Sequence, residues 1–70
     1  MMHFSRLIKA IKARREMLQV SQEMLAEVSG VSLRALKQFE SGKGNPTLKT
    51  ISKWADALGL EVTLQVKKPK

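Results

Sequence analysis

The side chains best suited to molecular recognition fall within one predicted helix, which follows the N-cap residue Ser32. Its helical spacing places Leu36 and Phe39 toward a core. Four side chains of the same helix face away from that core: Leu33, Arg34, Lys37 and Gln38. A second short helix is predicted over residues 22–29, and Gly30 separates the two as a tight turn. A cationic helix held across another in this way places side chains in the DNA major groove, so the pattern predicts sequence-specific DNA binding.

The sequence offers little for catalysis or for holding a cofactor. It contains no cysteine and one histidine, His3, which we expect to be solvated near the N-terminus. It has no plausible nucleophile–base pair, no cluster of metal-ligating side chains and no glycine-rich motif of the P-loop kind. We therefore predict no enzyme activity, no metal and no cofactor.

The composition limits the classes of binding partner that this chain can have, but it does not choose among them. The 70 residues make one domain, in which 13 Lys and Arg against 6 Asp and Glu give a formal net charge of +7. Such an excess attracts nucleic acid or an anionic membrane. No apolar stretch approaches the roughly 20 residues that span a bilayer, and the N-terminus lacks a signal-peptide pattern. We expect a cytoplasmic, nucleoid-associated protein without a membrane partner.

The first element that must position the recognition helix is a basic amphipathic helix over residues 4–17. Its apolar stripe comprises Phe4, Leu7, Ile8, Ile11 and Leu18. Its opposite face comprises Arg6, Lys9, Lys12 and Arg14. A basic amphipathic helix can also lie on a membrane surface, but here the following helices need the apolar stripe for their own core.

The remaining helices show clear start and stop signals. Ser21, Ser32 and Thr47 are good N-caps for helices that follow them, and Gly30 and Gly59 are suited to ending helices. In the helix over residues 22–29 the expected buried residues are Met24, Leu25 and Val28. In the fourth helix they are Leu48, Ile51, Trp54, Ala55 and Leu58.

From residue 60 the apolar period changes from helical to two. The alternating apolar residues are Leu60, Val62, Leu64 and Val66, which is a strand pattern. No second strand is predicted to pair with it, and an isolated strand leaves its backbone unpaired. We therefore predict a helix-turn-helix domain over residues 1–59, a strand over 60–67 that pairs between two copies in a homodimer, and a disordered basic tail over 68–70.

Two motifs in a single register, Ser21-Gln22-Glu23-x-Leu25-Ala26-x-x-x-Gly30-Val31-Ser32 and Phe39-Glu40-x-Gly42-Lys43, resemble the Cro/C1-type (Xre) helix-turn-helix family. The resemblance implies an all-α, lambda-repressor-like fold of four to five short helices. The stretch 42–48 and the terminal strand resemble a narrower subgroup, the HipB-like antitoxins, in which such a strand pairs across a dimer.

The resemblance also implies roles for individual residues. The positions that would read bases are Ser32, Leu33, Arg34 and Gln38. The positions that would contact phosphate are Gln22, Lys37 and Lys43, although Gln22 is alternatively a polar first-turn residue. By their chemistry, Arg34 suits guanine and Gln38 suits adenine, while Leu33 can contact a thymine methyl group. Arg15 and Glu40 match a structural ion pair of the family.

Two residues depart from the family pattern. Gln19 stands where the family often has Gly at the end of the first helix, so a left-handed residue there would cost about 1 kcal/mol relative to Gly. Leu33 occupies an often polar position, which would leave an apolar side chain exposed.

These observations predict a repressor that binds a palindromic operator as a homodimer. In the antitoxin version it also binds a HipA-like serine/threonine kinase toxin. One alternative is a stand-alone or prophage Xre-type repressor without a toxin. Another, from a different class, is a protein-interaction module that has lost DNA binding, since fold alone does not fix function.

Overall fold

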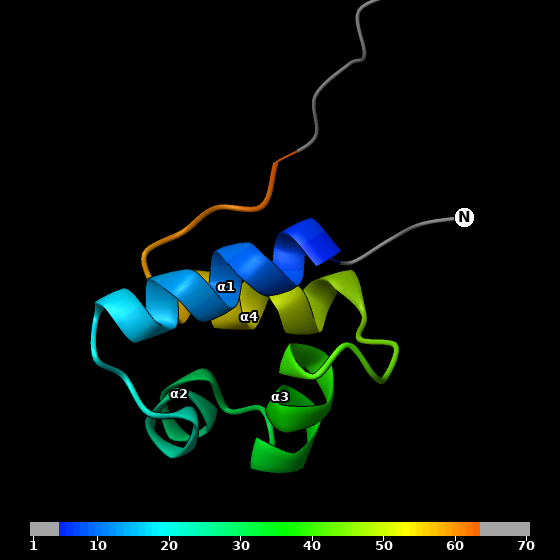
Figure 1. The fold of residues 1–70 in the computed structure, drawn as a ribbon, viewed down its shortest axis with the longest axis horizontal. Helices are drawn as coiled ribbons and strands as arrows, with labels where there is room; N and C mark the ends of the chain where they lie inside the picture. The colour runs from blue at the N-terminus through cyan, green and yellow to red at the C-terminus, as the bar shows by residue number, and fades with distance from the viewer. Residues whose placement is uncertain (1–4, 64–70) are drawn as a thin grey trace, which may run out of the picture.

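The computed structural model describes residues 5–63 as four helices joined by short loops. They are α1 (Ser5–Met17), α2 (Gln22–Ser29), α3 (Leu33–Glu40) and α4 (Leu48–Ala57). α1 and α4 lie on one side of the molecule, and α2 and α3 lie on the other (Figure 1). None of these helices is long and apolar enough to cross a membrane. The predicted all-α helix-turn-helix arrangement is confirmed for this part of the chain.

Three helices begin at the caps that the sequence predicts. The side-chain oxygens of Ser21, Ser32 and Thr47 each accept a hydrogen bond from the backbone N–H three residues later, at 3.0, 3.2 and 3.1 Å. Each cap satisfies one of the amide donors that the first turn of a helix leaves without an intrahelical acceptor. These three contacts fix the starting residues of α2, α3 and α4.

Left-handed residues end the helices. Beyond the end of α1, Gln19 has φ 58°. Its N–H donates to the carbonyl of Glu16 at 3.0 Å, and the N–H of Val20 donates to the carbonyl of Arg15 at 3.0 Å. Gly59 closes α4 with the same pair of hydrogen bonds and φ 74°. This is the Schellman arrangement, in which glycine avoids the steric cost of a Cβ atom. α1 therefore ends on a residue that bears this cost.

Replacing Gln19 with Gly is expected to raise the free energy of unfolding by about 1 kcal/mol, because the backbone conformation stays the same while the strain of the Cβ atom is removed. Urea unfolding followed by the fluorescence of Trp54, the single tryptophan, measures the change. The control is Gln38→Gly within α3, where the same substitution should destabilise by about 1 kcal/mol. A loss of stability in both variants would contradict the interpretation of Gln19.

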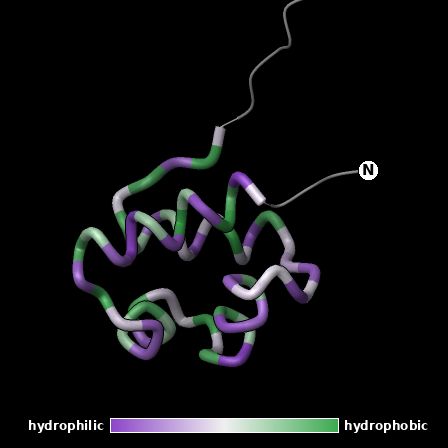
Figure 2. The backbone as a smooth tube through the Cα atoms, viewed as in Figure 1, coloured by the Kyte–Doolittle hydropathy of each residue, from purple (hydrophilic) through white to green (hydrophobic). Residues whose placement is uncertain are grey.

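One core joins all four helices. Its buried members are Ile11, Leu25, Leu36, Phe39, Ile51, Trp54 and Leu58. Trp54 is fully buried and packs on Phe39, with ring centroids 4.8 Å apart and planes tilted by 34°. Figure 2 shows hydrophobic and hydrophilic segments alternating along each helix, as expected when every helix presents one apolar side to a shared core.

The indole Nε1 of Trp54 is the one buried side-chain polar atom within residues 5–63 that has no hydrogen-bond partner. Buried donors are paired in the great majority of cases, and leaving one unpaired costs about 1–3 kcal/mol. Burial of the Trp54 ring therefore stabilises the core, whereas burial of its unpaired N–H costs free energy at the same position.

The predicted inward face of α2 is wrong, because the side that faces the core is rotated about the helix axis from the predicted one. Leu25 is buried as expected, but Met24 is 51% exposed and Val28 is 67% exposed. The side facing the core instead includes the half-buried polar residues Gln22 and Ser29, which are spaced seven apart. α2 is only eight residues long, and its first and last residues are both polar and half-buried. The positions of its apolar residues alone therefore did not identify the side that faces the core.

Three further positions differ from the predicted faces. Leu18 and Leu48 are exposed, because each lies at a helix end where the stripe leaves the buried core. Arg14, expected on the solvent face of α1, is half-buried, and its Nε donates to the carbonyl of Leu58 at 2.9 Å. This bond links the end of α1 to the end of α4. Phe4 of the predicted stripe lies outside the described residues.

The predicted strand falls only partly within the described residues. Residues 60–63 adopt no regular secondary structure, and the side chains of Leu60 and Val62 pack against the core of their own chain. In the single chain these two side chains therefore pack on the helices, and no strand is formed over residues 60–63. Leu64, Val66 and the tail over 68–70 lie outside the described residues.

Candidate nucleic-acid interface

The turn between α2 and α3 fixes how α3 is presented. Gly30, at φ 77°, ends α2, and its N–H donates to the carbonyl of Ala26 at 3.0 Å. The N–H of Val31 then donates to the Ser29 hydroxyl at 3.3 Å, and Ser32 caps α3. Each residue of the turn thus has a defined backbone role, which sets the direction of α3 relative to α2.

α3 divides into a buried side and an exposed side. Leu36, Phe39 and Glu40 are buried, whereas Arg34, Lys37 and Gln38 are exposed. The three exposed residues are spaced by three and four, so they share one face of the helix. Its only formal charges are positive, and its carboxamide adds donors and an acceptor. This face has the chemistry needed to contact base edges and phosphates.

Residues at the start of α3 complete this surface. Ser32 is exposed, whereas Leu33 is half-buried. The expectation of a freely exposed apolar side chain at position 33 is therefore wrong, because the fold covers part of it. A partly covered leucine still has apolar surface for contact with another molecule.

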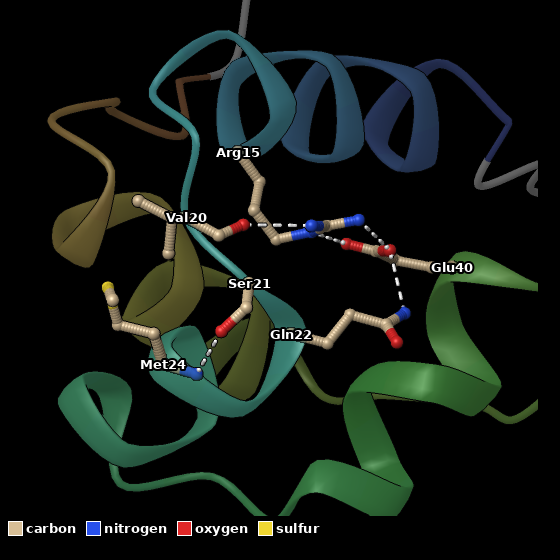
Figure 3. Close-up of polar contacts among 6 residues, drawn as sticks. All are labelled: Arg15, Val20, Ser21, Gln22, Met24 and Glu40. Carbon is tan, nitrogen blue, oxygen red and sulfur yellow. Dashed lines mark hydrogen bonds and ion pairs between the residues drawn. The ribbon is translucent and has the colours of Figure 1, made fainter.

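A buried ion pair holds α3 against α1 (Figure 3). Arg15 and Glu40, the residues expected to pair, form two hydrogen bonds of 2.8 Å, from Nε to Oε2 and from Nη2 to Oε1. Nη1 of Arg15 also donates to the carbonyl of Val20 at 2.9 Å. The hydrogen bonds with Glu40 raise the pKa of the Arg15 guanidinium above its ordinary value and outweigh the opposing effect of burial. The Arg15 guanidinium therefore stays charged, and its hydrogen bonds to Glu40 link the end of α1 to the end of α3.

Gln22 adds a third member to this network. It is half-buried at the start of α2, and its Nε2 donates to Oε1 of Glu40 at 3.0 Å (Figure 3). The first residue of α2 is thereby tied to the last residue of α3. This contact braces α3 against the start of α2. Sequence reasoning did not identify Glu40 as the partner, because no local pattern reports a contact between residues 18 apart.

The loop after α3 returns to the exposed helix face. Lys43 is exposed, and its backbone N–H donates to the carbonyl of Gln38 at 2.8 Å. The hydroxyl of Ser41 donates to the same carbonyl at 2.9 Å. Lys43 and Gln38, expected to contact phosphate and base respectively, are thus held close together by the backbone.

Charges elsewhere on the described surface are arranged differently. α1 has the exposed cations Arg6, Lys9 and Lys12, while α2 has the exposed acids Glu23 and Glu27. Within residues 5–63, no group of three His, Cys, Asp or Glu side chains is placed to hold a metal ion. The α3 face and its loop thus combine exposed cations, an exposed carboxamide and a fixed backbone on one surface.

Comparison with known proteins agrees with this geometry. A family model described as Helix-turn-helix, HTH_3, matches residues 11–65, well over half of the chain. The cryptic phage CTXphi transcriptional repressor RstR of Vibrio cholerae is 38% identical over 48 residues, which are 69% of this chain and 43% of the relative. An uncharacterised HTH-type transcriptional regulator of Haemophilus influenzae is 34% identical over 58 residues, which are 83% of this chain and 59% of the relative.

The chain belongs to the HTH_3 helix-turn-helix family. It spans less than two thirds of the length of either curated relative. Both relatives are named as transcriptional regulators, one of them as a repressor.

Proposed function

We propose that this protein is a transcriptional repressor that binds a specific DNA sequence by placing α3 in the major groove. The observation that supports this most strongly is the division of α3, with Arg34, Lys37 and Gln38 exposed on one face and Glu40 locked to Arg15 on the other. A helix whose buried side is held in place can present its exposed side to base edges in a defined register. The phage repressor among the relatives agrees with this function.

Within this proposal the residues divide into base readers and phosphate contacts. Arg34 donates to guanine through its guanidinium, and Gln38 pairs with adenine through its carboxamide. Ser32 and Leu33 lie at the start of the helix, where the leucine contacts a thymine methyl group. The phosphate contacts are Gln22, Lys37 and Lys43. For Gln22 the bond to Glu40 occupies one amide hydrogen and leaves the other free to donate.

The proposal includes a homodimer on a palindromic operator. Two-fold symmetry would place the two copies of α3 about 34 Å apart on one face of the DNA. The alternating apolar residues 60–66 are the proposed pairing segment. An open groove lined by apolar residues of α1 and α4, including Leu7 and Ile51, lies beside Leu60 and Val62 and offers further surface to a second copy. Sedimentation equilibrium separates monomer from dimer and tests this part alone.

Two versions of the repressor differ in their partners. The HipB-like antitoxin version rests on the stretch 42–48 and the alternation from residue 60, and it adds a HipA-like kinase toxin. The stand-alone version is favoured by the phage repressor among the relatives. Co-purification of a kinase from the native host would support the antitoxin version, and a repressor recovered alone would support the other.

Lys43→Ala is expected to weaken binding to every duplex alike, because a contact to phosphate contains no information about sequence. The dependence of log affinity on log salt should become shallower by about 0.9 for each lost contact. Fluorescence anisotropy at several salt concentrations measures both quantities. The control is Lys9→Ala, which removes an exposed lysine of α1. A change of base preference in the Lys43 variant would contradict the assigned role.

Selection of bound duplexes from a randomised pool tests the function as a whole. Sequencing of the selected DNA should show an enriched motif with two half-sites related by two-fold symmetry. A pool that remains random after selection would contradict sequence-specific binding. An enriched motif without symmetry would retain the DNA-binding function and overturn the dimer.

A further inference from the structure

The outer side of α2 combines exposed apolar residues with exposed acids. Met24 and Val28 are 51% and 67% exposed, and their spacing of four residues places them on one side of the helix. Glu23 and Glu27 are exposed directly before them in the chain, and α2 contains no cation. These four residues are called the acidic face of α2.

The proposed DNA-binding function does not use the acidic face of α2. Its carboxylates repel DNA phosphates, so a contact of this face with nucleic acid is unfavourable. The only salt bridge within residues 5–63 is the buried pair between α1 and α3, so neither acid is paired with a cation of that part of the chain. Covering Met24 and Val28 would remove apolar surface from water. The face therefore fits a cationic protein surface.

The outer side of α1 has the complementary chemistry. Its exposed residues Arg6, Lys9, Lys12 and Ala13 are called the basic face of α1. Glu16, the only acid of α1, lies beyond them toward the end of the helix. The small side chain of Ala13, one turn after Lys9, allows the side chains of another helix to approach closely.

We propose that the acidic face of α2 binds the basic face of α1 of a second copy of this chain. Met24 and Val28 pack beside Ala13, and the glutamates of one copy pair with the lysines of the other. Each copy has both faces, so the contact is heterologous and can repeat from copy to copy. It differs from the two-fold pairing proposed for residues 60–66, because no residue of the basic face lines the groove beside that segment.

The contact requires no part of the proposed DNA-binding function. If that function also holds, the contact would join copies that are bound at neighbouring sites on one DNA molecule, where their effective concentration is high. A duplex long enough for a single dimer has no neighbouring copy, so this contact does not enter a titration with such a duplex.

Sedimentation velocity of the full chain without DNA tests the proposal. We expect the average sedimentation coefficient to rise with protein concentration beyond that of a monomer or a two-fold dimer. The association should weaken as salt is added, because the paired charges are exposed in the free chain. Sedimentation that stops changing at the monomer or at the dimer would overturn the proposal and leave the acidic face to a cationic surface of a different protein.

Reversing the charge of either face should weaken the association. Glu23→Lys with Glu27→Lys, and separately Lys9→Glu with Lys12→Glu, bring like charges together and should each lower the association constant by about tenfold or more. The first pair of substitutions raises the net charge and the second lowers it. Overall repulsion between copies would therefore predict opposite effects, whereas the proposed contact predicts a loss in both.

Combining all four substitutions is the decisive variant. It exchanges the charges of the two faces and keeps the formal net charge of the chain at +7. The association should recover, because opposite charges again meet across the contact. A four-substitution variant that associates no better than the two reversals would overturn the pairing of α2 with α1. Urea unfolding of each variant checks that it is folded.

Two further variants test the apolar part and the specificity of the contact. Val28→Ser leaves every charge in place and should weaken the association while its salt dependence remains. Lys49→Glu reverses an exposed lysine of α4 outside both faces and should leave the association unchanged. Equal losses in Lys49→Glu and in the reversal of α1 would overturn the proposal. Failure of DNA binding leaves these measurements intact, so the two proposals fail separately.

Discussion

Replacing Glu40 with alanine is expected to lower the free energy of unfolding by about 3–5 kcal/mol, the usual cost of leaving one member of a buried ion pair alone. Arg15 and Glu40 are each 9% exposed, so the substitution leaves a largely desolvated guanidinium without its carboxylate. The substitution also removes the acceptor for Gln22. Urea unfolding followed by Trp54 fluorescence measures the loss.

Two controls separate the pair from other effects of substitution. Glu27→Ala removes an exposed glutamate of α2 and should change stability by less than about 0.5 kcal/mol. The double variant Arg15→Met with Glu40→Leu replaces both charges by apolar side chains and should recover much of the loss. A change of less than about 1 kcal/mol in Glu40→Ala would show that the pair contributes little to stability.

Arg34→Ala is expected to reduce discrimination at one base pair of each half-site by about 1–3 kcal/mol, or about 5–150-fold. The reason is that a guanidinium pairs with both acceptors of guanine, whereas a methyl group pairs with neither. Anisotropy competition between the selected duplex and duplexes changed at single positions measures the preference.

The comparison for this prediction is Lys37→Ala on the same face of α3. As a phosphate contact, Lys37 should weaken all duplexes by a similar factor and leave the preferred bases unchanged. If Arg34→Ala instead weakens selected and random duplexes equally, Arg34 does not read a base. Arg34 is exposed, so both variants are expected to fold.

Local signals in the sequence were sufficient to place the helices. Ser21, Ser32 and Thr47 are caps whose hydrogen bonds reach only three residues along the chain, and Gly30 adopts a left-handed conformation that glycine tolerates at low cost. Such interactions join residues within one turn of a helix, so residue type and spacing are sufficient to predict them. The fold of residues 5–59 follows largely from these signals and from the apolar stripes of α1, α3 and α4.

Features that depend on distant partners could not be predicted in the same way. Gln22 faces inward because Glu40 offers it an acceptor, and Arg14 turns toward the carbonyl at the end of α4. Neither contact leaves a trace in the local pattern, and both polar residues were assigned to solvent or to DNA. Val28 shows the reverse error, since an apolar residue on a short helix need not face the core.

The candidate interface was predictable in composition but not in its surroundings. The exposed face of α3 follows from helical period alone, so Arg34, Lys37 and Gln38 were placed correctly on it. A cavity lined by Gln38 arises where the loop 42–47 meets α4, and no pattern in the sequence predicts an empty volume. The pairing proposed for residues 60–66 would need a second copy, so a single chain does not test it.

The measurement that tests the central claim most directly is anisotropy with two labelled duplexes of equal composition. One is the DNA upstream of this protein's own gene, and the other is a shuffled version of it. Both are titrated at low and near-physiological salt, because nonspecific phosphate binding weakens steeply between the two. We predict that tight binding to the upstream duplex survives the higher salt while binding to the shuffled duplex is lost. Equal, salt-sensitive binding to both would contradict sequence-specific recognition by α3 and favour a protein-interaction module on the same fold.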